Sequence, residues 1–261
     1  MKKIILLLLL MPFPLVWGQF INAEKKILSV FSADTFIGYD KFGARYGIRD
    51  NVFFKSADGI SAEYRNLSLG RISRVDLQNP LSILLFYEDF NTVVTLDNQL
   101  NEIRAINFSE NNPPIVAAAA GMAAQNRFWI YEAVSQQIGL YDYLNNKHTV
   151  LTQPLRGDML HYESDFNYFY WIDEQYNWYA CDMFGKISFQ GTVPEYDHII
   201  IAGIQLLFYT KDGTIYVRDL KNGKTYEIRN VEKSFNSFNY TDQILSIFTK
   251  DGITNYKITI P

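Results

Sequence analysis

The stretch LLFYTKDGTIYVRDLKNGKTYEI, Leu206 to Ile228, reads as three short strands joined by an Asp-Gly turn and an Asn-Gly turn. Both dipeptides favour tight hairpins between strands in which apolar residues alternate with polar ones. A three-stranded ribbon of this size cannot bury its apolar face without neighbours. The fold therefore depends on whether this unit is repeated elsewhere in the chain.

Five further segments have the same layout, in which a polar tip separates two apolar strands. They are ARYGIRDNVFFKS from Ala44, LLFYEDFNTVVTLD from Leu84, WIYEAVSQQIGLYD from Trp129, FYWIDEQYNWYACD from Phe169 and LSIFTKDGITNYKI from Leu245. With the copy at Leu206 included, successive starts lie 40, 45, 40, 37 and 39 residues apart. A period near 40 residues that contains only strands is typical of propeller blades. We therefore predict an all-β, six-bladed β-propeller with four antiparallel strands in each blade.

The last unit lacks a fourth strand, because the chain ends at ITNYKITIP directly after its third. An open outer edge at that place would favour aggregation. The segment of about residues 25–33, which contains KKILSVFS, has no other role in the repeat count. We predict that it forms the missing outer strand and closes the ring. The run AAAAGMAA (117–124) is interpreted as an inner strand whose small side chains suit the crowded axis, with a short helix as the alternative.

The first residues, MKKIILLLLLMPFPLVWGQ, combine two lysines, an apolar run and the small residue Gly18. This pattern predicts a secretory signal peptide over residues 1–18, followed by a single propeller domain over 19–261. The apolar run contains Pro12 and Pro14 and is shorter than the roughly 20 residues of a membrane span. No cysteine stands directly after the expected cleavage point. We expect an exported protein of the periplasm or extracellular space that has no membrane span and is not a lipoprotein.

Composition supports a packed globular chain, with 48% hydrophobic residues, 16% aromatic residues and a formal net charge of -4. No basic stripe occurs, so we expect no nucleic-acid partner. Cys181 is the only cysteine, which excludes an internal disulfide. It lies in the apolar strand pattern NWYACD, which predicts a buried thiol.

Two stretches, ADTFIGYDKFGARYGIRDNVFFK (33–55) and LSLGRISRVDLQNPLSILLFYEDFNTVVTLDNQLNEI (67–103), resemble exported six-bladed propeller-like proteins of Bacteroidota envelopes. That family is similar in layout to NHL and TolB-type propellers, and DKFGARYGI resembles the Asp-x-x-Gly strand connection of NHL blades. The resemblance implies a fold and a compartment. It implies no activity and no residue roles.

Four aspartates end the third strand of successive predicted blades, namely Asp97, Asp142, Asp182 and Asp219. Such repeated carboxylates occur in calcium loops, but here they lie about a blade width apart and cannot converge on one ion. Asp side chains also start turns by accepting hydrogen bonds from nearby backbone groups. We therefore predict that these four residues start the turns to the fourth strands.

A second polar set falls in or beside the predicted inner strands, and consists of Asp76, His161, Glu163 and His198. In propellers, inner strands surround a central channel where several blades can ligate one metal ion. Only every second residue of a strand points into the channel, and the sequence leaves the phase open. These residues support an alternative function, a lactonase-like or lyase-like propeller enzyme that uses calcium or zinc.

Large rings in YFYWIDEQYNWYA (168–180) are expected to fill the space between blades, whereas a ring at a hairpin tip is not needed there. Phe90 with Asn91, and Tyr176 with Asn177, lie at such tips, and exposed tip aromatics commonly mark contact surfaces. No nucleophile elbow, phosphate-binding Gly-rich loop or HExxH helix occurs. We therefore predict a non-enzymatic binding or scaffolding propeller of the cell envelope. We expect no cofactor and an envelope protein as partner, and the oligomeric state stays open.

Overall fold

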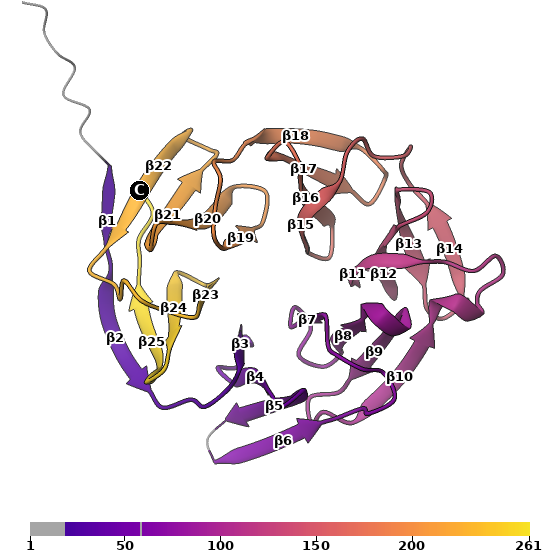
Figure 1. The fold of residues 1–261 in the computed structure, drawn as a ribbon, viewed down its shortest axis with the longest axis horizontal. Coiled ribbons are helices and arrows are strands. Elements are labelled where there is room, and N and C mark those ends of the chain that lie inside the picture. Colours follow the sequence, from indigo (N-terminus) through magenta and orange to yellow (C-terminus); the bar gives the residue numbers. More distant parts are fainter. Residues whose placement is uncertain (1–18, 58) are drawn as a thin grey trace, which may run out of the picture.

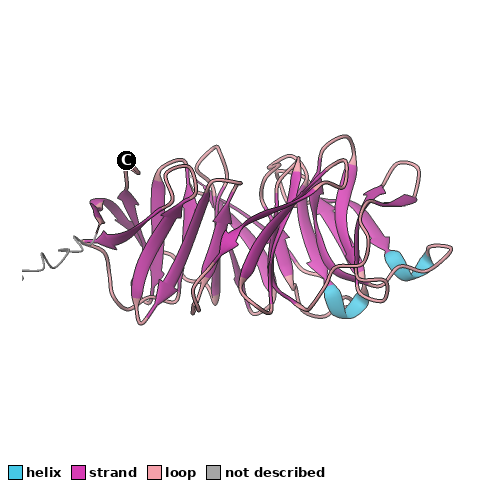
Figure 2. Ribbon diagram, turned by 90° about the horizontal axis from the view of Figure 1, so that it is seen from above, coloured by secondary structure: helices cyan, strands magenta, loops and turns pink. Residues whose placement is uncertain are grey.

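Six β-sheets stand around a central axis in the computed structural model, which describes residues 19–57 and 59–261 (Figure 1). Each sheet contains four antiparallel strands from the axis outward, and one sheet has an additional strand. From the side the ring is a flat disc (Figure 2). The predicted six-bladed β-propeller is confirmed, whereas the predicted signal peptide lies outside the described residues.

Blades 1 to 3 are each built from four consecutive strands. They comprise β3 (Thr35–Tyr39), β4 (Arg45–Arg49), β5 (Val52–Ala57) and β6 (Ile60–Tyr64) in blade 1; β7 (Arg74–Asp76), β8 (Ile83–Tyr87), β9 (Thr92–Leu96) and β10 (Glu102–Asn107) in blade 2; and β11 (Ala117–Ala123), β12 (Arg127–Glu132), β13 (Gln137–Asp142) and β14 (Lys147–Val150) in blade 3. The alanine-rich run is therefore the inner strand β11, as predicted. Two 3₁₀ helices, η1 (Glu88–Phe90) and η2 (Phe108–Glu110), lie on one face of the disc (Figure 2).

Blades 4 and 5 continue the same order. They comprise β15 (Met159–Ser164), β16 (Tyr168–Asp173), β17 (Asn177–Asp182) and β18 (Ile187–Thr192) in blade 4, and β19 (Ile199–Ala202), β20 (Leu206–Lys211), β21 (Thr214–Asp219) and β22 (Lys224–Arg229) in blade 5. The three strands predicted from Leu206 to Ile228 are therefore β20, β21 and β22.

The sixth blade joins the two ends of the described chain. Its inner three strands are β23 (Ser237–Thr241), β24 (Ile244–Thr249) and β25 (Gly252–Lys257), and its outer strand is β2 (Glu24–Ser29). β2 pairs antiparallel with β25, with Lys25 opposite Tyr256 and Leu28 opposite Thr254. The segment predicted to close the ring, at about 25–33, thus closes it with residues 24–29, and the residues that follow connect to blade 1.

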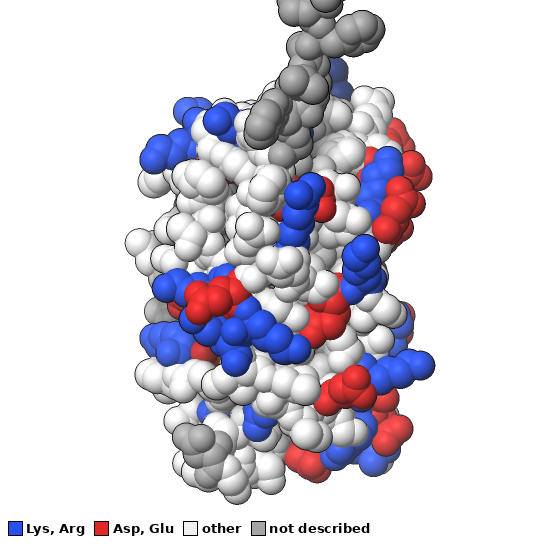
Figure 3. All heavy atoms as spheres, turned by 90° about the vertical axis from the view of Figure 1, so that its left-hand side faces the viewer, with Lys and Arg blue, Asp and Glu red and all other residues white. Residues whose placement is uncertain are grey.

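A short strand, β1 (Phe20–Asn22), precedes β2 and pairs in parallel with β22 of blade 5. Ile21 is buried in the apolar cluster that also contains Phe208 and Ile228. The N-terminal segment therefore bridges blades 5 and 6. On the side of the disc that carries this segment, acidic and basic side chains are interspersed and form no single-sign patch (Figure 3).

Aromatic rings fill the space between blades, as predicted for the stretch 168–180. Phe169 and Trp178 are fully buried, and Trp171 packs with Trp129 in the cluster between blades 3 and 4. Cys181 lies in the same cluster as a free thiol, and burial raises its pKa to about 12. This thiol is therefore an apolar core group, as the sequence predicts.

Phe31 closes the space between blades 6 and 1 directly after the closing strand. Its ring stacks on Phe54 with 5.3 Å between ring centroids, and lies edge-on to Phe36 at 5.6 Å and to Phe248 at 6.2 Å. A Cβ atom on Gly47 would lie 2.9 Å from the Phe31 ring, so glycine is required there. The closing segment is thus fixed by packing as well as by backbone pairing.

Replacing Phe31 by Ala should lower the free energy of unfolding by about 3–4 kcal/mol, because a buried ring at the seam is lost. Its neighbour Val30 is 86% exposed, so Val30→Ala should change the free energy of unfolding by less than about 0.5 kcal/mol. Urea unfolding followed by tryptophan fluorescence measures both values. Equal effects of the two changes would show that the seam does not depend on Phe31.

Candidate functional site

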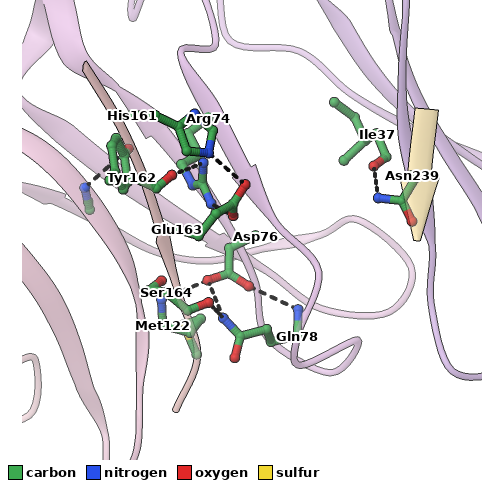
Figure 4. Close-up of polar contacts among 11 residues, drawn as sticks. Ile37, Arg74, Asp76, Gln78, Met122, His161, Tyr162, Glu163, Ser164 and Asn239 are labelled. Atoms are coloured by element: carbon green, nitrogen blue, oxygen red, sulfur yellow. Dashed lines mark hydrogen bonds and ion pairs between the residues drawn. The ribbon is translucent and has the colours of Figure 1, made fainter. Parts of the chain in front are cut away.

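The inner strands of blades 2, 3 and 4 bring polar side chains together at the axis (Figure 4). β11 lies between β7 and β15, and a Cβ atom on its Gly121 would collide with the hydroxyl of Ser164. Because β11 carries such small side chains, Arg74 of β7 reaches β15 directly. Arg74 Nη1 donates to the Tyr162 carbonyl at 3.1 Å, and Arg74 Nη2 donates to the Glu163 carboxylate. The central ion pair therefore links blades 2 and 4 across blade 3.

Arg74 and Glu163 stabilise each other's charge. Burial alone would raise the pKa of Glu163, but Arg74 and His161 lower it to about 2. Burial alone would lower the pKa of Arg74, but Glu163 and Tyr162 raise it above its ordinary value. The guanidinium also lies over the Tyr162 ring, with 4.5 Å from Arg74 Cζ to the ring centroid. The carboxylate and the guanidinium are both charged at neutral pH.

Asp76 connects β7 to β11 beside this ion pair. Its Oδ2 accepts from the Met122 amide at 2.9 Å and from Gln78 Nε2 at 3.0 Å, and its Oδ1 accepts from the Gln78 amide at 2.9 Å. Gln78 Nε2 also donates to the Ser164 carbonyl at 2.6 Å. Burial raises the pKa of Asp76 despite these donors. The carboxyl group is thus a fixed structural acceptor.

The four residues of the predicted metal site are only partly brought together. His161 Nε2 lies 3.4 Å from Glu163 Oε1, whereas His198 lines a separate cavity of about 260 Å³ that also meets His161. Both oxygens of Asp76 face N–H donors, and Glu163 faces the positive charge of Arg74. Within residues 19–57 and 59–261, no three His, Cys, Asp or Glu side chains are arranged to hold a metal ion. Asp76 and Glu163 are therefore engaged by other groups of the protein.

The larger part of the channel is a cavity of about 660 Å³. β3 and β23 line one side of it, and β7 with Glu163 and Ser164 lines the other. On the β3 side, Asn239 Nδ2 donates to the Ile37 carbonyl at 3.2 Å and ties blade 6 to blade 1 (Figure 4). Many polar groups of this channel are thus engaged with one another.

The repeated aspartates start turns, as predicted. Asp97, Asp142 and Asp182 each accept two backbone N–H groups with Oδ1, and Asp219 accepts one from Lys221. Each carboxylate therefore holds its own connection from the third to the fourth strand.

Asn91, predicted as a binding residue, is held inside the fold. It has a left-handed backbone with φ 51°, and its Nδ2 donates to Ser109 Oγ at 2.9 Å and to the Ile115 carbonyl at 2.6 Å. Its Oδ1 accepts from the Ala117 amide at 2.9 Å. Asn91 thus fixes the connection from blade 2 to blade 3.

The second predicted tip is also built into the fold. The Tyr176 ring is half-buried and lies edge-on to Tyr196 at 5.9 Å between centroids. Asn177 Nδ2 donates to Asp173 Oδ2 at 3.1 Å, and Asn177 Oδ1 accepts from Thr192 Oγ1 at 3.3 Å. Of the four tip residues, Phe90 presents the largest exposed apolar group.

Phe90, 49% exposed, lies on loops of one face together with Leu67, Val116 and Val134, which are 78%, 47% and 79% exposed; these four residues are called the apolar strip. Loops of three blades build this strip. The Phe90 ring lies 3.0 Å from the Cβ position of Gly70 in the loop that carries Leu67. Val116 follows Ile115, which Asn91 binds, and its carbonyl accepts from the Ala133 amide at 2.8 Å, next to Val134.

Acidic side chains border the apolar strip. Glu88 and Asp89 are exposed in η1 directly before Phe90, and Glu110 is exposed at the end of η2. The sequence analysis singled out only Phe90 of the strip. Leu67, Val116 and Val134 are single apolar residues in loops far apart in sequence, so no local pattern marks them.

No protein-family model matches the chain, and no curated protein matches it. Among solved structures, it is similar to a streptogramin B lyase with a TM-score of 0.57, at 10% identity over 92% of this chain and 98% of that one. It is similar to virginiamycin B lyase from Staphylococcus aureus with a TM-score of 0.57, at 12% identity over 85% of this chain and 79% of that one. The β-propeller domain of Cps50 (Swd1) from Myceliophteria thermophila matches with a TM-score of 0.60, at 9% identity over 91% of this chain and all of that one (100%). At such identities the similarity shows the propeller fold alone.

No helix among the described residues is sufficiently long and apolar to cross a membrane.

Glu163→Gln should lower the free energy of unfolding by about 2–3 kcal/mol at pH 7, because Arg74 loses its buried partner. The folded pKa of Glu163, about 2, lies below its ordinary 4.5, so the carboxylate stabilises the fold above about pH 4.5. This stabilisation is lost as pH falls from 4.5 towards 2. Denaturation from pH 7 to pH 3 should therefore show the difference from wild type shrinking. The exposed Glu195 provides the control Glu195→Gln, and a pH-independent difference would contradict the assignment.

Proposed function

We propose that this chain is a non-catalytic binding propeller of the bacterial cell envelope, and that the apolar strip binds a partner protein. The observation that carries the proposal is the strip itself, in which Leu67, Phe90, Val116 and Val134 lie exposed on neighbouring loops. Apolar side chains bordered by polar ones on a rigid scaffold are typical of interaction sites. Asn91 contributes by fixing the loop that presents Val116.

The carboxylates at the channel are already engaged within the protein, which favours a binding function over catalysis. A lactonase-like or lyase-like metal site needs carboxylates that are free to contact the ion. Here Glu163 is paired with Arg74, and Asp76 is saturated by N–H donors. Metal analysis of the purified protein tests this alternative directly. Stoichiometric calcium or zinc that is lost in His161→Ala would favour the enzyme.

The cellular placement is part of the proposal and is supported by the sequence. Residues 1–18 have the pattern of a secretory signal peptide, and no cysteine follows them until Cys181. The stretches 33–55 and 67–103 resemble exported envelope propellers of Bacteroidota. We infer an exported protein of the periplasm or extracellular space whose partner is another envelope protein.

The opposite face of the disc provides an internal control. It exposes Phe42, Leu81, Phe166 and Ile204, each on the loop between the first and second strands of a different blade. Phe42 is 71% exposed and thus matches Phe90 in chemistry and exceeds it in exposure.

A photoreactive phenylalanine analogue at position 90 or 134 should cross-link one envelope protein in cells, whereas the same analogue at position 42 should not. Leu67→Ser combined with Val116→Ser should abolish the adduct, because the strip loses its apolar surface. Mass spectrometry of the adduct identifies the partner. An adduct from position 42 alone would move the binding surface to the opposite face and contradict this proposal.

A further inference from the structure

The outer strand edges of the ring differ in how they are protected. Among the described residues, no strand pairs with the outer edges of β6, β10, β14 and β18, whereas β1 covers the edge of β22. Charged side chains protect an open edge from pairing with another chain. β6 contains Glu63, β10 contains Glu102 and Arg104, and β14 contains Lys147. β18, with the sequence ISFQGT, contains no charged residue.

The edge of β18, which lacks charged residues, also exposes apolar side chains. Ile187 is 41% exposed and Phe189 is 60% exposed, and both lie on the outer strand of blade 4 at the rim of the disc (Figure 1). Phe184, in the loop just before the strand, is 92% exposed. This edge is therefore suited to a neighbour that offers both backbone hydrogen bonds and apolar contacts.

The backbone phase of β18 follows from its pairing with β17. The Asp182 amide donates to the Lys186 carbonyl at 3.1 Å, which makes these two residues a hydrogen-bonded pair. The next pairs are Cys181 with Ile187, Ala180 with Ser188 and Tyr179 with Phe189, after which the register shifts at Gln190. Hydrogen-bonded and non-hydrogen-bonded pairs alternate in an antiparallel ladder. Ile187 and Phe189 thus point their own N–H and C=O groups outward.

The ring itself demonstrates that an outer edge can accept a further strand. At blade 5, the Glu227 amide donates to the Gln19 carbonyl and the Ala23 amide donates to the Arg229 carbonyl, each at 3.0 Å. β1 adds to β22 through these bonds and buries Ile21. The outer edge of a fourth strand in this propeller can therefore pair with one more strand.

We propose that β18 pairs antiparallel with β18 of a second copy of this chain, about a two-fold axis at Ser188. In this register Ile187 of each copy lies opposite Phe189 of the other. The outward N–H and C=O groups of these two residues then form the hydrogen bonds between the copies. Their side chains lie on the same face of the joined sheet, because both occupy odd positions of the strand. The two blade 4 sheets then form one continuous sheet.

The self-paired segment is short and places no like charges opposite each other. Lys186 faces Gln190 of the second copy, so no like charges stand opposite each other. The Thr192 carbonyl already accepts from Arg218 of blade 5, which ends the free edge at that point. The dimer contact lies on the rim and leaves the apolar strip on the face open, so the proposal is independent of the proposed function.

A cysteine at position 188 tests the register. Residues directly opposite in a non-hydrogen-bonded pair have Cα atoms about 4.5 Å apart, which suits a disulfide. The single native cysteine, Cys181, is buried. Oxidation of the Ser188→Cys protein, expressed from the full sequence, should give a covalent dimer on a non-reducing gel. Ser61→Cys, on the outer strand β6 of blade 1, is the matched control and should stay monomeric.

Sedimentation analysis tests the dimer itself. Wild type should form a dimer, and Phe189→Lys should raise the dissociation constant at least about thirtyfold, because a charge replaces the apolar side chain at the centre of the contact. Ile103→Lys, on the exposed outer strand β10, should leave dimerisation unchanged. Circular dichroism shows that each variant is folded. A monomeric wild type, or a disulfide that forms no faster at position 188 than at 61, overturns the proposal.

Discussion

The pairing of β2 with β25 is the interaction on which the whole ring depends. It joins positions at least 224 residues apart in the chain, the separation of Ser29 and Ile253. Bringing such distant segments together costs conformational entropy, and the pairing alone would not offset that cost. Phe31 adds a buried aromatic cluster at the same seam, and β1 adds a second attachment on blade 5. Three contacts therefore hold the ring closed, and the channel and both faces exist only because it is closed.

The small side chains of β11 determine which residues can meet at the axis. β11 carries alanines and Gly121 where other inner strands carry larger side chains, so Arg74 can cross in front of it to Glu163. The charged groups that suggest chemistry in the sequence are thereby used to bind one blade to another. The exposed apolar side chains on the loops and the rim take no part in these contacts between blades. We therefore propose that recognition of other molecules uses the outside of the disc.

The sequence predicted the parts of this protein that arise from repetition. The 40-residue period indicates six blades, the missing last strand indicates closure by the N-terminal segment, and the aspartate column indicates turns. β1 escaped prediction because three residues carry no clear alternation. The role of Asn91 escaped it because a left-handed tip residue looks the same whether its amide faces solvent or a neighbouring loop. The apolar strip combines loops of three blades, and the contact of Arg74 with Glu163 crosses a whole blade, so neither has a local signal.

The place of β2 in the chain has a consequence for how the protein reaches its native state. Ribosomes make a chain from its N-terminus, so β2 is made more than 200 residues before its partner β25. Until β25 is made, β2 lacks its partner strand, and the charges of Glu24, Lys25 and Lys26 disfavour pairing with other chains. The same charges remain at the rim after closure. Lys25 and Lys26, which precede the first apolar residues of β2, thus disfavour association with other chains during synthesis and remain charged groups on the rim of the finished disc.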